Sequence, residues 1–287
     1  MTAPIIVLGM HRSGTTMVAR LLSHMGVFMG ADVDANHESR LFQGLNDWLL
    51  TRAGARWDEP APFDRMLADA RFVAVQADYL ATRLAGPARL RYLGWRRSLL
   101  SGGRLQSAGP WGWKDPRNSL SLPVWLALYP SARLVHVRRH GVDVARSLVT
   151  RSQRSRALTA QNFYRRRWMH RFVPKRGGFV DSPRCLEADG AMDLWCAYLD
   201  RVGPRLGAAA EAGLTVVDLH YEDLLAAPAA TLGRLAGDLA LPVSDSGLAA
   251  LAERVNPQRR FAYRDDPDWL QVAARYQSLL ARYGYAA

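Results

Sequence analysis

The sequence has few cysteines, no long hydrophobic run and no histidine cluster. Cys185 and Cys196 are the only cysteines in 287 residues, which excludes a disulfide framework and favours a reducing compartment. No apolar run reaches about eighteen residues, so we expect no transmembrane helix. We expect no signal peptide either, because no basic segment followed by an apolar one opens the chain, and we predict a cytoplasmic protein. The seven histidines show no ligand spacing, so we expect no metal.

Lysine is almost absent as well, although the formal net charge is +12. Lys114 and Lys175 are the only lysines, and arginine supplies the remaining positive charge. Two explanations stay open: the composition of a GC-rich bacterial genome, or a surface that attracts anionic ligands. No nucleic-acid motif accompanies the charge, so we expect no nucleic-acid partner.

An apolar, β-branched run at residues 5–8 predicts a buried parallel strand. A loop of pattern G-x-x-x-x-G-T-T follows over Gly9–Thr16, and a helical pattern then runs to Met25 before Gly26 stops it. Strand, glycine-bounded loop and helix direct several N–H groups and a helix N-terminus at one point. This arrangement predicts an anion site, against the alternative of a glycine turn without ligand.

The loop differs from that of nucleoside-triphosphate enzymes at one position. Thr15 occupies the place where their motif has lysine, and Arg12 is the only cation in the loop. An ATP-dependent kinase is therefore the weaker interpretation, although it stays open.

Two further stretches carry polar residues suited to chemistry. Asn36 is a candidate N-cap for a helix through Leu50, which places Glu38 in the first turn. Glu38 then complements the helix N-terminus, or has a chemical role, or does both. Lys114 ends a short strand before Asp-Pro and a helix, at the edge where open α/β folds bind ligands. A surface Lys–Asp pair is the alternative.

Arg139 follows a strand at 132–137, and Ser147 lies about two turns into the helix after it. A converging arginine and hydroxyl form a simple phosphate site, whereas the alternative is an ordinary basic helix start. Residues 151–176 then hold eight arginines and one lysine with four interleaved aromatic residues. This basic segment suits a sugar or nucleic-acid face, a lid over an anionic ligand, or a solvated amphipathic helix.

Strands and helices alternate along the whole chain. We predict helices over 65–84 and 188–210 and a last clear strand at 214–220. Alternation of this kind predicts a mainly parallel sheet. The expected fold class is therefore a three-layer α/β domain with helices flanking the sheet, as in P-loop NTPases. We expect a single domain over 1–287, in which 150–187 form a basic lid or acceptor-binding insertion.

Three separated motifs resemble the bacterial sulfotransferases that use 3′-phosphoadenosine 5′-phosphosulfate, PAPS, within the P-loop-like superfamily. His11–Thr16 resembles their 5′-phosphosulfate loop, with arginine where many members have lysine. Arg139–Ser147 resembles their R-x-P-x-D-x-x-x-S element for the 3′-phosphate, with Gly141 in place of proline. Tyr221–Leu224 is similar to the segment that closes the sheet in relatives, a structural role.

The resemblance implies roles for individual residues. The residues implied to bind PAPS are Arg12, Ser13, Gly14, Thr15, Thr16, Arg139 and Ser147, with Arg259 or Arg260 as a late contact to the 3′-phosphate. Small-molecule sulfotransferases use a histidine from a Lys-Thr-His run, but this chain has Lys114-Asp115-Pro116. Glu38 resembles the glutamate base of carbohydrate sulfotransferases, and His37 is the alternative base. Lys114 matches the lysine near the transferred sulfuryl group.

The implied reaction moves a sulfuryl group from PAPS to a hydroxyl and releases 3′,5′-ADP without a metal. The expected acceptor is a saccharide, a glycolipid or another hydroxyl-bearing small molecule, and peripheral contact with a membrane stays open. The alternatives are a P-loop kinase that uses ATP and a non-catalytic module that binds nucleotides or polyanions.

Overall fold

The structure is a computed structural model that describes residues 3–105, 109–175 and 178–285. The strands are β1 (Ile5–Gly9), β2 (Gly112–Lys114), β3 (Arg133–Arg138) and β4 (Val216–His220). The α-helices are α1 (Thr15–His24), α2 (Arg40–Arg52), α3 (Ala61–Leu67), α4 (Ala70–Ala85), α5 (Ala88–Leu100), α6 (Asn118–Leu128), α7 (Gly141–Arg166), α8 (Ala188–Glu211), α9 (Tyr221–Ala226), α10 (Pro228–Asp238), α11 (Asp245–Ala252), α12 (Pro267–Arg275) and α13 (Gln277–Arg282). Short 3₁₀ helices are η1 (Arg167–Arg171), η2 (Pro183–Leu186), η3 (Pro257–Arg259) and η4 (Ala262–Asp265).

The chain divides into two compact units. The first contains residues 1–139 and 200–260, and the second contains residues 140–199 and 261–287. All four strands and the loop after β1 belong to the first unit. Within the described ranges, no helix has the length and apolar character needed to cross a membrane.

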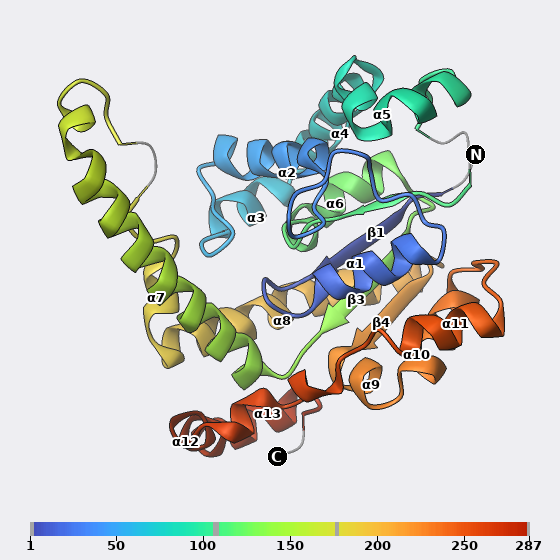
Figure 1. Ribbon diagram of the computed structural model, residues 1–287. Helices are drawn as coiled ribbons and strands as arrows, with labels where there is room; N and C mark the ends of the chain where they lie inside the picture. Colours follow the sequence, from blue (N-terminus) through green and yellow to red (C-terminus); the bar gives the residue numbers. More distant parts are fainter. Residues whose placement is uncertain (1–2, 106–108, 176–177, 286–287) are drawn as a thin grey trace. The chain divides into compact units, whose positions relative to one another are not determined.

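The first unit is built on a four-stranded sheet in the order β2-β1-β3-β4 (Figure 1). Every neighbouring pair is parallel, with Val7 opposite both Lys114 and Val135. The carboxyl ends of the strands therefore meet at one edge, from which the loops after Gly9, Lys114, Arg138 and His220 leave. The expected α/β fold with a parallel sheet flanked by helices is confirmed.

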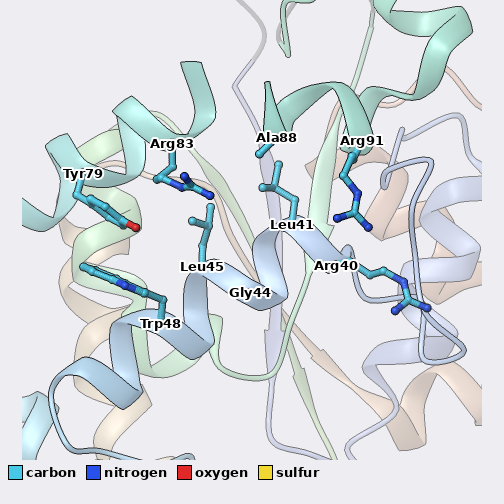
Figure 2. A pocket seen from close by; sticks show the side chains of 9 residues that line it. All are labelled: Arg40, Leu41, Gly44, Leu45, Trp48, Tyr79, Arg83, Ala88 and Arg91. Carbon is cyan, nitrogen blue, oxygen red and sulfur yellow. The ribbon is translucent and has the colours of Figure 1, made fainter. Parts of the chain in front are cut away.

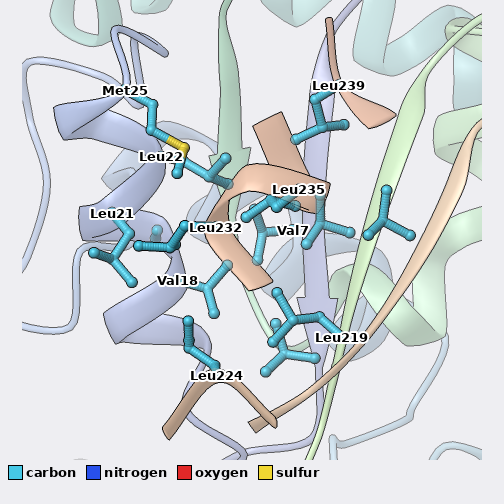
Figure 3. Close-up of a cluster of buried hydrophobic side chains, with 14 of the residues drawn as sticks. Val7, Val18, Leu21, Leu22, Met25, Leu219, Leu224, Leu232, Leu235 and Leu239 are labelled. Atoms are coloured by element: carbon cyan, nitrogen blue, oxygen red, sulfur yellow. The ribbon is translucent and has the colours of Figure 1, made fainter. Parts of the chain in front are cut away.

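One face of the sheet packs against α1, α9 and α10 (Figure 3). Leu251 of α11 belongs to the same buried cluster. Alternate strand residues such as Val7, Val135 and Leu219 face Val18 and Leu22 of α1 and the leucines of α10 in a buried apolar cluster. Because a central strand of a parallel sheet has both faces covered, β1 is continuously apolar and all five of its residues are buried. Burial of this face holds the start of α1 at the end of β1.

The predicted helix over 65–84 is two helices. Asp69 separates α3 from α4, and its carboxylate accepts a hydrogen bond from the Arg71 N–H at 2.9 Å. Asp is a strong N-cap because its side chain satisfies an otherwise unpaired helical N–H. The capping residue inside the apolar pattern therefore restarts the helix.

The second unit contains α7, the longest helix among the described residues, with η4, α12 and α13. Asp143 accepts the Tyr263 N–H at 3.0 Å, and the His140 ring stacks on Tyr263 with centroids 4.8 Å apart. A Cβ on Gly141 would lie 2.9 Å from the Trp195 ring. Close packing on tryptophan therefore explains the glycine at the position where the sequence motif has proline.

Candidate active site

The loop between β1 and α1 is shaped by backbone conformations that favour glycine. Gly14 caps α1 at φ 96°, and Arg12 also has a positive φ of 74°. A Cβ on Gly14 would lie 2.3 Å from the Tyr221 ring, so only glycine allows this contact. The sheet-closing segment at Tyr221 thus supports the loop directly.

The start of α1 offers hydrogen-bond donors with no protein partner among the described residues. The N–H groups of Gly14, Thr15 and Thr16 donate no hydrogen bond there, as expected for the first turn of a helix. The Ser13 Oγ is buried and also has no partner within the described ranges. Several donors and a helix N-terminus therefore face one place, and this geometry suits an anion.

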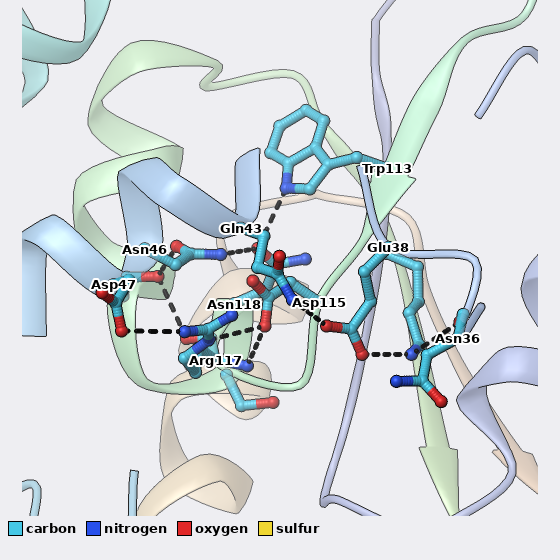
Figure 4. Close-up of polar contacts among 12 residues, drawn as sticks. Asn36, Glu38, Gln43, Asn46, Asp47, Trp113, Asp115, Arg117 and Asn118 are labelled. Carbon is cyan, nitrogen blue, oxygen red and sulfur yellow. Dashed lines mark hydrogen bonds and ion pairs between the residues drawn. The ribbon is translucent and has the colours of Figure 1, made fainter. Parts of the chain in front are cut away.

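Glu38 and Lys114 form a buried ion pair at the carboxyl edge of the sheet. Figure 4 shows Glu38 among the polar contacts at this edge. The Lys114 Nζ lies 2.7 Å from the Glu38 Oε1, and the two side chains are only 2% and 8% exposed. Lys114 also donates to the Asn36 carbonyl at 3.1 Å and to the Thr16 hydroxyl at 3.4 Å. The lysine therefore joins the glutamate to the first turn of α1.

The Glu38 carboxylate is held on both oxygens. Its Oε2 accepts a hydrogen bond from the Gln43 amide at 3.0 Å, while Oε1 accepts from Lys114. Burial raises the pKa of Glu38 above its ordinary value, and Lys114 opposes this rise. A buried carboxylate with a raised pKa is a stronger base than a solvated one, so the position suits proton abstraction.

A turn ahead of α2 positions Glu38, and it differs from the predicted cap. Asp34 Oδ1 accepts the N–H groups of Asn36 and Glu38 at 2.9 and 2.8 Å. The helix begins later, with Ser39 at the N-cap position. The prediction that Asn36 caps the helix and Glu38 lies in its first turn is therefore wrong. The hydrogen bonds to Asp34 form a turn that holds Asn36 and Glu38 instead, and His37 has a φ of 61° within this turn.

His37 lies next to this pair in the sequence. Burial and the nearby charges of Arg20 and Lys114 lower its pKa, so the imidazole is neutral at pH 7. Its Nε2 is buried and accepts or donates no hydrogen bond among the described residues.

Side chains that no sequence motif indicates hold the end of β2 in place. Asn118 accepts hydrogen bonds from the Asn46 amide at 2.8 Å and the Trp113 indole at 2.9 Å, and it donates to the Val7 carbonyl at 2.9 Å. Trp113 stacks on Phe42 with ring centroids 4.0 Å apart. These contacts tie β1, β2 and α2 together, so they fix the strand that ends in Lys114 and the helix that follows Glu38.

Three of the predicted basic residues come together at the other end of this edge. The Arg139 guanidinium donates to the carbonyl oxygens of Arg12 at 3.4 Å and Arg259 at 3.2 Å, and it lies 4.8 Å from the centre of the Tyr221 ring. Arg260 is exposed beside Arg259. Ser147 lies on α7 in the second unit, so its pairing with Arg139 stays a prediction.

A family model described as "Sulfotransferase family" matches residues 4–245. The chain belongs to the sulfotransferase family. None of the curated proteins matches this sequence. Within the described ranges, no group of three or more His, Cys, Asp or Glu residues is arranged to hold a metal ion.

Several solved sulfotransferases resemble the chain at low identity. The sulfotransferase STF1 from Mycobacterium tuberculosis is 18% identical, with a TM-score of 0.44 over 97% of this chain and 77% of its own. The sulfotransferase domain from the curacin biosynthetic pathway is 13% identical, with a TM-score of 0.49 over 96% and 97%. The sulfotransferase STF9 from Mycobacterium avium is 18% identical, with a TM-score of 0.45 over 90% and 69%.

This sulfotransferase also has a pocket of about 260 Å³ between α2, α4 and α5 (Figure 2). Trp48 and Tyr79 stack at one end with centroids 4.0 Å apart, and the Arg83 side chain makes no hydrogen bond or ion pair with the described residues. Arg40 and Arg91 lie at the other end, where both bind Asp32. The lining residues come from three helices, so the helical spacing of those on α2 is the only signal for this pocket in the sequence.

Proposed function

We propose that this protein transfers a sulfuryl group from PAPS to an acceptor hydroxyl and releases 3′,5′-ADP. The observation that carries the proposal is the buried Glu38–Lys114 pair, whose lysine also reaches Thr16 at the start of α1. A base and a cation thus lie beside the loop that bears the family motif. The low cysteine content supports a cytoplasmic setting.

The donors at the start of α1 fit the charged end of PAPS. The N–H groups of Gly14, Thr15 and Thr16 and the buried Ser13 hydroxyl lack partners among the described residues, and an anion would satisfy them. PAPS supplies an activated sulfuryl group when bound. In this proposal Arg12 adds positive charge at the same loop.

Arg139 holds the 3′-phosphate in the proposed complex, with Ser147 and either Arg259 or Arg260. Its contacts with the Arg12 and Arg259 carbonyls support this role, because they place a guanidinium beside the phosphosulfate loop. Arginine suits the role since its planar fork matches phosphate oxygens.

Glu38 acts as the general base in this mechanism. It accepts the proton of the acceptor hydroxyl while the hydroxyl oxygen forms a bond to sulfur and the bond from sulfur to the 3′,5′-ADP oxygen breaks. Lys114 and Arg12 stabilise the charge that develops on the departing oxygen, as cations do in the related phosphoryl transfers. The raised pKa of Glu38 favours this proton transfer. His37, neutral at pH 7, is the alternative base.

A saccharide or glycolipid is the proposed acceptor. The pocket between α2, which follows Glu38, and α4 supports this choice. Trp48 of α2 and Tyr79 of α4 provide aromatic surface, and Arg83 of α4 provides a donor without a hydrogen-bond partner among the described residues. Sugars combine apolar ring faces with hydroxyl groups, which such linings recognise.

The test compares Glu38→Gln with the wild type in PAPS turnover against a panel of saccharide and glycolipid acceptors. We expect kcat to fall by about 10²–10⁴-fold, the usual contribution of general base catalysis. Calorimetry should show unchanged binding of 3′,5′-ADP, which separates lost chemistry from lost folding. Asp47→Asn is the matched control, because it makes the same change to an exposed carboxylate on α2.

Near-normal turnover in Glu38→Gln would overturn the assignment of the base. His37→Asn then decides whether the imidazole takes that role. If no wild-type preparation consumes PAPS but 3′,5′-ADP binds, the protein is a binding module and the proposed reaction is wrong.

A further inference from the structure

The carboxyl-terminal half of α7 and the turn after it form a basic arm, defined here as residues 151–175. Residues 144–180 contain nine arginines and one lysine but no aspartate or glutamate. Six arginines of the arm make no ion pair with any residue that the structure describes: Arg154, Arg156, Arg165, Arg166, Arg167 and Arg171. The arm therefore carries a concentrated positive charge that the described protein does not neutralise.

Large apolar side chains of the same arm are exposed. Tyr164, Trp168 and Phe172 are 69%, 63% and 80% exposed, and the aliphatic side chains of Leu158, Met169 and Val173 are also open to solvent. Exposed apolar residues are normal when scattered, but a group of this size beside unpaired cations marks an interaction surface.

The structure separates this arm from the core of its own unit (Figure 1). Along α7 the buried residues run from Gly141 to Ser152, and none follows in the helix or in η1. The aromatic rings are nevertheless ordered against one another: Phe163 stacks on His170 with centroids 5.7 Å apart and meets Phe179 at 5.4 Å. The turn is thus folded back on the helix end while the other rings stay exposed.

We propose that the basic arm docks this protein on an anionic lipid surface. Arginines bind the headgroups, and Trp168, Phe172 and the aliphatic side chains enter the boundary between headgroups and acyl chains. Charge complementarity selects this partner, because a stretch with ten cations and no acid repels a second copy of itself. Nucleic acid would use the cations and rings but leaves Leu158, Met169 and Val173 without an apolar environment.

Sedimentation with lipid vesicles tests the inference on the full chain. The protein should co-sediment with vesicles of phosphatidylglycerol and phosphatidylcholine. Vesicles of pure phosphatidylcholine should bind it much more weakly. High salt should weaken binding, because exposed charges are screened. The inference does not depend on the proposed reaction, since the readout needs no PAPS.

Two variants separate the charged and apolar contributions. Arg165→Gln/Arg166→Gln/Arg167→Gln should reduce partitioning by about a hundredfold, because each interfacial cation contributes roughly a fivefold factor. Trp168→Ser/Phe172→Ser should reduce it by roughly tenfold at unchanged charge, because partitioning scales with the apolar area that enters the lipid. The matched control is Trp95→Ser/Leu100→Ser, which removes two exposed apolar residues of α5 and should leave partitioning unchanged.

Three outcomes would overturn the inference. Equal binding to both vesicle types would show that the arm does not recognise anionic lipid. Loss of binding in the α5 control with retention in the arm variants would place the lipid contact elsewhere. Binding to a single-stranded oligonucleotide that depends on the arm, with none to anionic vesicles, would make the arm a nucleic-acid surface.

Discussion

The carboxyl edge of the sheet and the basic arm use charge in opposite ways. At the sheet edge, Lys114 is buried and bound to Glu38, Asn36 and Thr16, and Arg117 is bound to Asp115 and Asp47. In the arm, six arginines are exposed and have no ion-pair partner among the described residues. The charges at the sheet edge are thus paired with one another inside the protein, whereas the charges of the arm are left available to a partner outside the chain.

Lys114→Met removes the buried cation at the sheet edge and should give the largest loss of unfolding free energy. Removal of one partner leaves the other charge buried and unpaired, which costs about 3–5 kcal/mol. Urea unfolding should show this loss, and Glu38→Gln/Lys114→Met should recover much of it because no ionised group is left unpaired there. A double variant as unstable as the single one would show that the loss comes from packing rather than from charge.

Gly14→Ala should disturb the loop that the same edge supports. The new Cβ meets the Tyr221 ring at 2.3 Å in a left-handed conformation, which costs on the order of 1–3 kcal/mol. We expect weaker binding of 3′,5′-ADP as well, measured by calorimetry beside urea unfolding. Gly207→Ala in α8 is the control, because its Cβ meets no atom within 4 Å. Equal effects in both variants would contradict the role given to the Gly14–Tyr221 contact.

The pH dependence of kcat/KM should report the pKa of Glu38, which burial raises and Lys114 lowers. Because the base acts when deprotonated and its pKa is raised, activity should fall as the pH drops through a value above 4.5. Lys114 lowers that pKa, so Lys114→Met should move the acidic limb to higher pH. A limb that moves to lower pH would show that Glu38 is not the titrating group.

Substitutions in the arm should have the smallest effect on the stability and turnover of the protein. Arg166→Gln/Arg167→Gln removes two exposed cations without ion-pair partners among the described residues, so stability should change by no more than about 0.5 kcal/mol. Turnover with a water-soluble acceptor should stay the same. A clear loss of unfolding free energy or of kcat would mean that the arm belongs to the folded core or to the active site.

The sequence predicted local features well and contacts across long separations poorly. The strand, loop and helix over residues 5–24 follow from a contiguous motif, so their positions were predictable. The Asn36 cap was wrong, because the turn depends on Asp34 and on a bridge between Val33 and Ser39. Glu38 and Lys114 could each be singled out, but their 2.7 Å contact joins residues 76 positions apart.

The same limit applies to the residues that support the site. Tyr221 belongs to a segment for which the sequence predicts a structural role. No local pattern indicates that its ring packs on Gly14 and lies beside Arg139. Asn46 and Asn118 are ordinary helix residues in the sequence, and only the fold brings their amides together. Such contacts depend on the sheet order, in which β1 lies between β2 and β3.

Calorimetric binding of 3′,5′-ADP and ATP, without and with Mg²⁺, decides whether PAPS or ATP is the donor. We expect tight, metal-independent binding of 3′,5′-ADP to the wild type. That binding should be lost in Arg139→Ala and unchanged in Arg234→Ala, which alters an exposed arginine of α10. Preference for ATP with Mg²⁺, or equal binding in both variants, would contradict the assignment of PAPS as the donor.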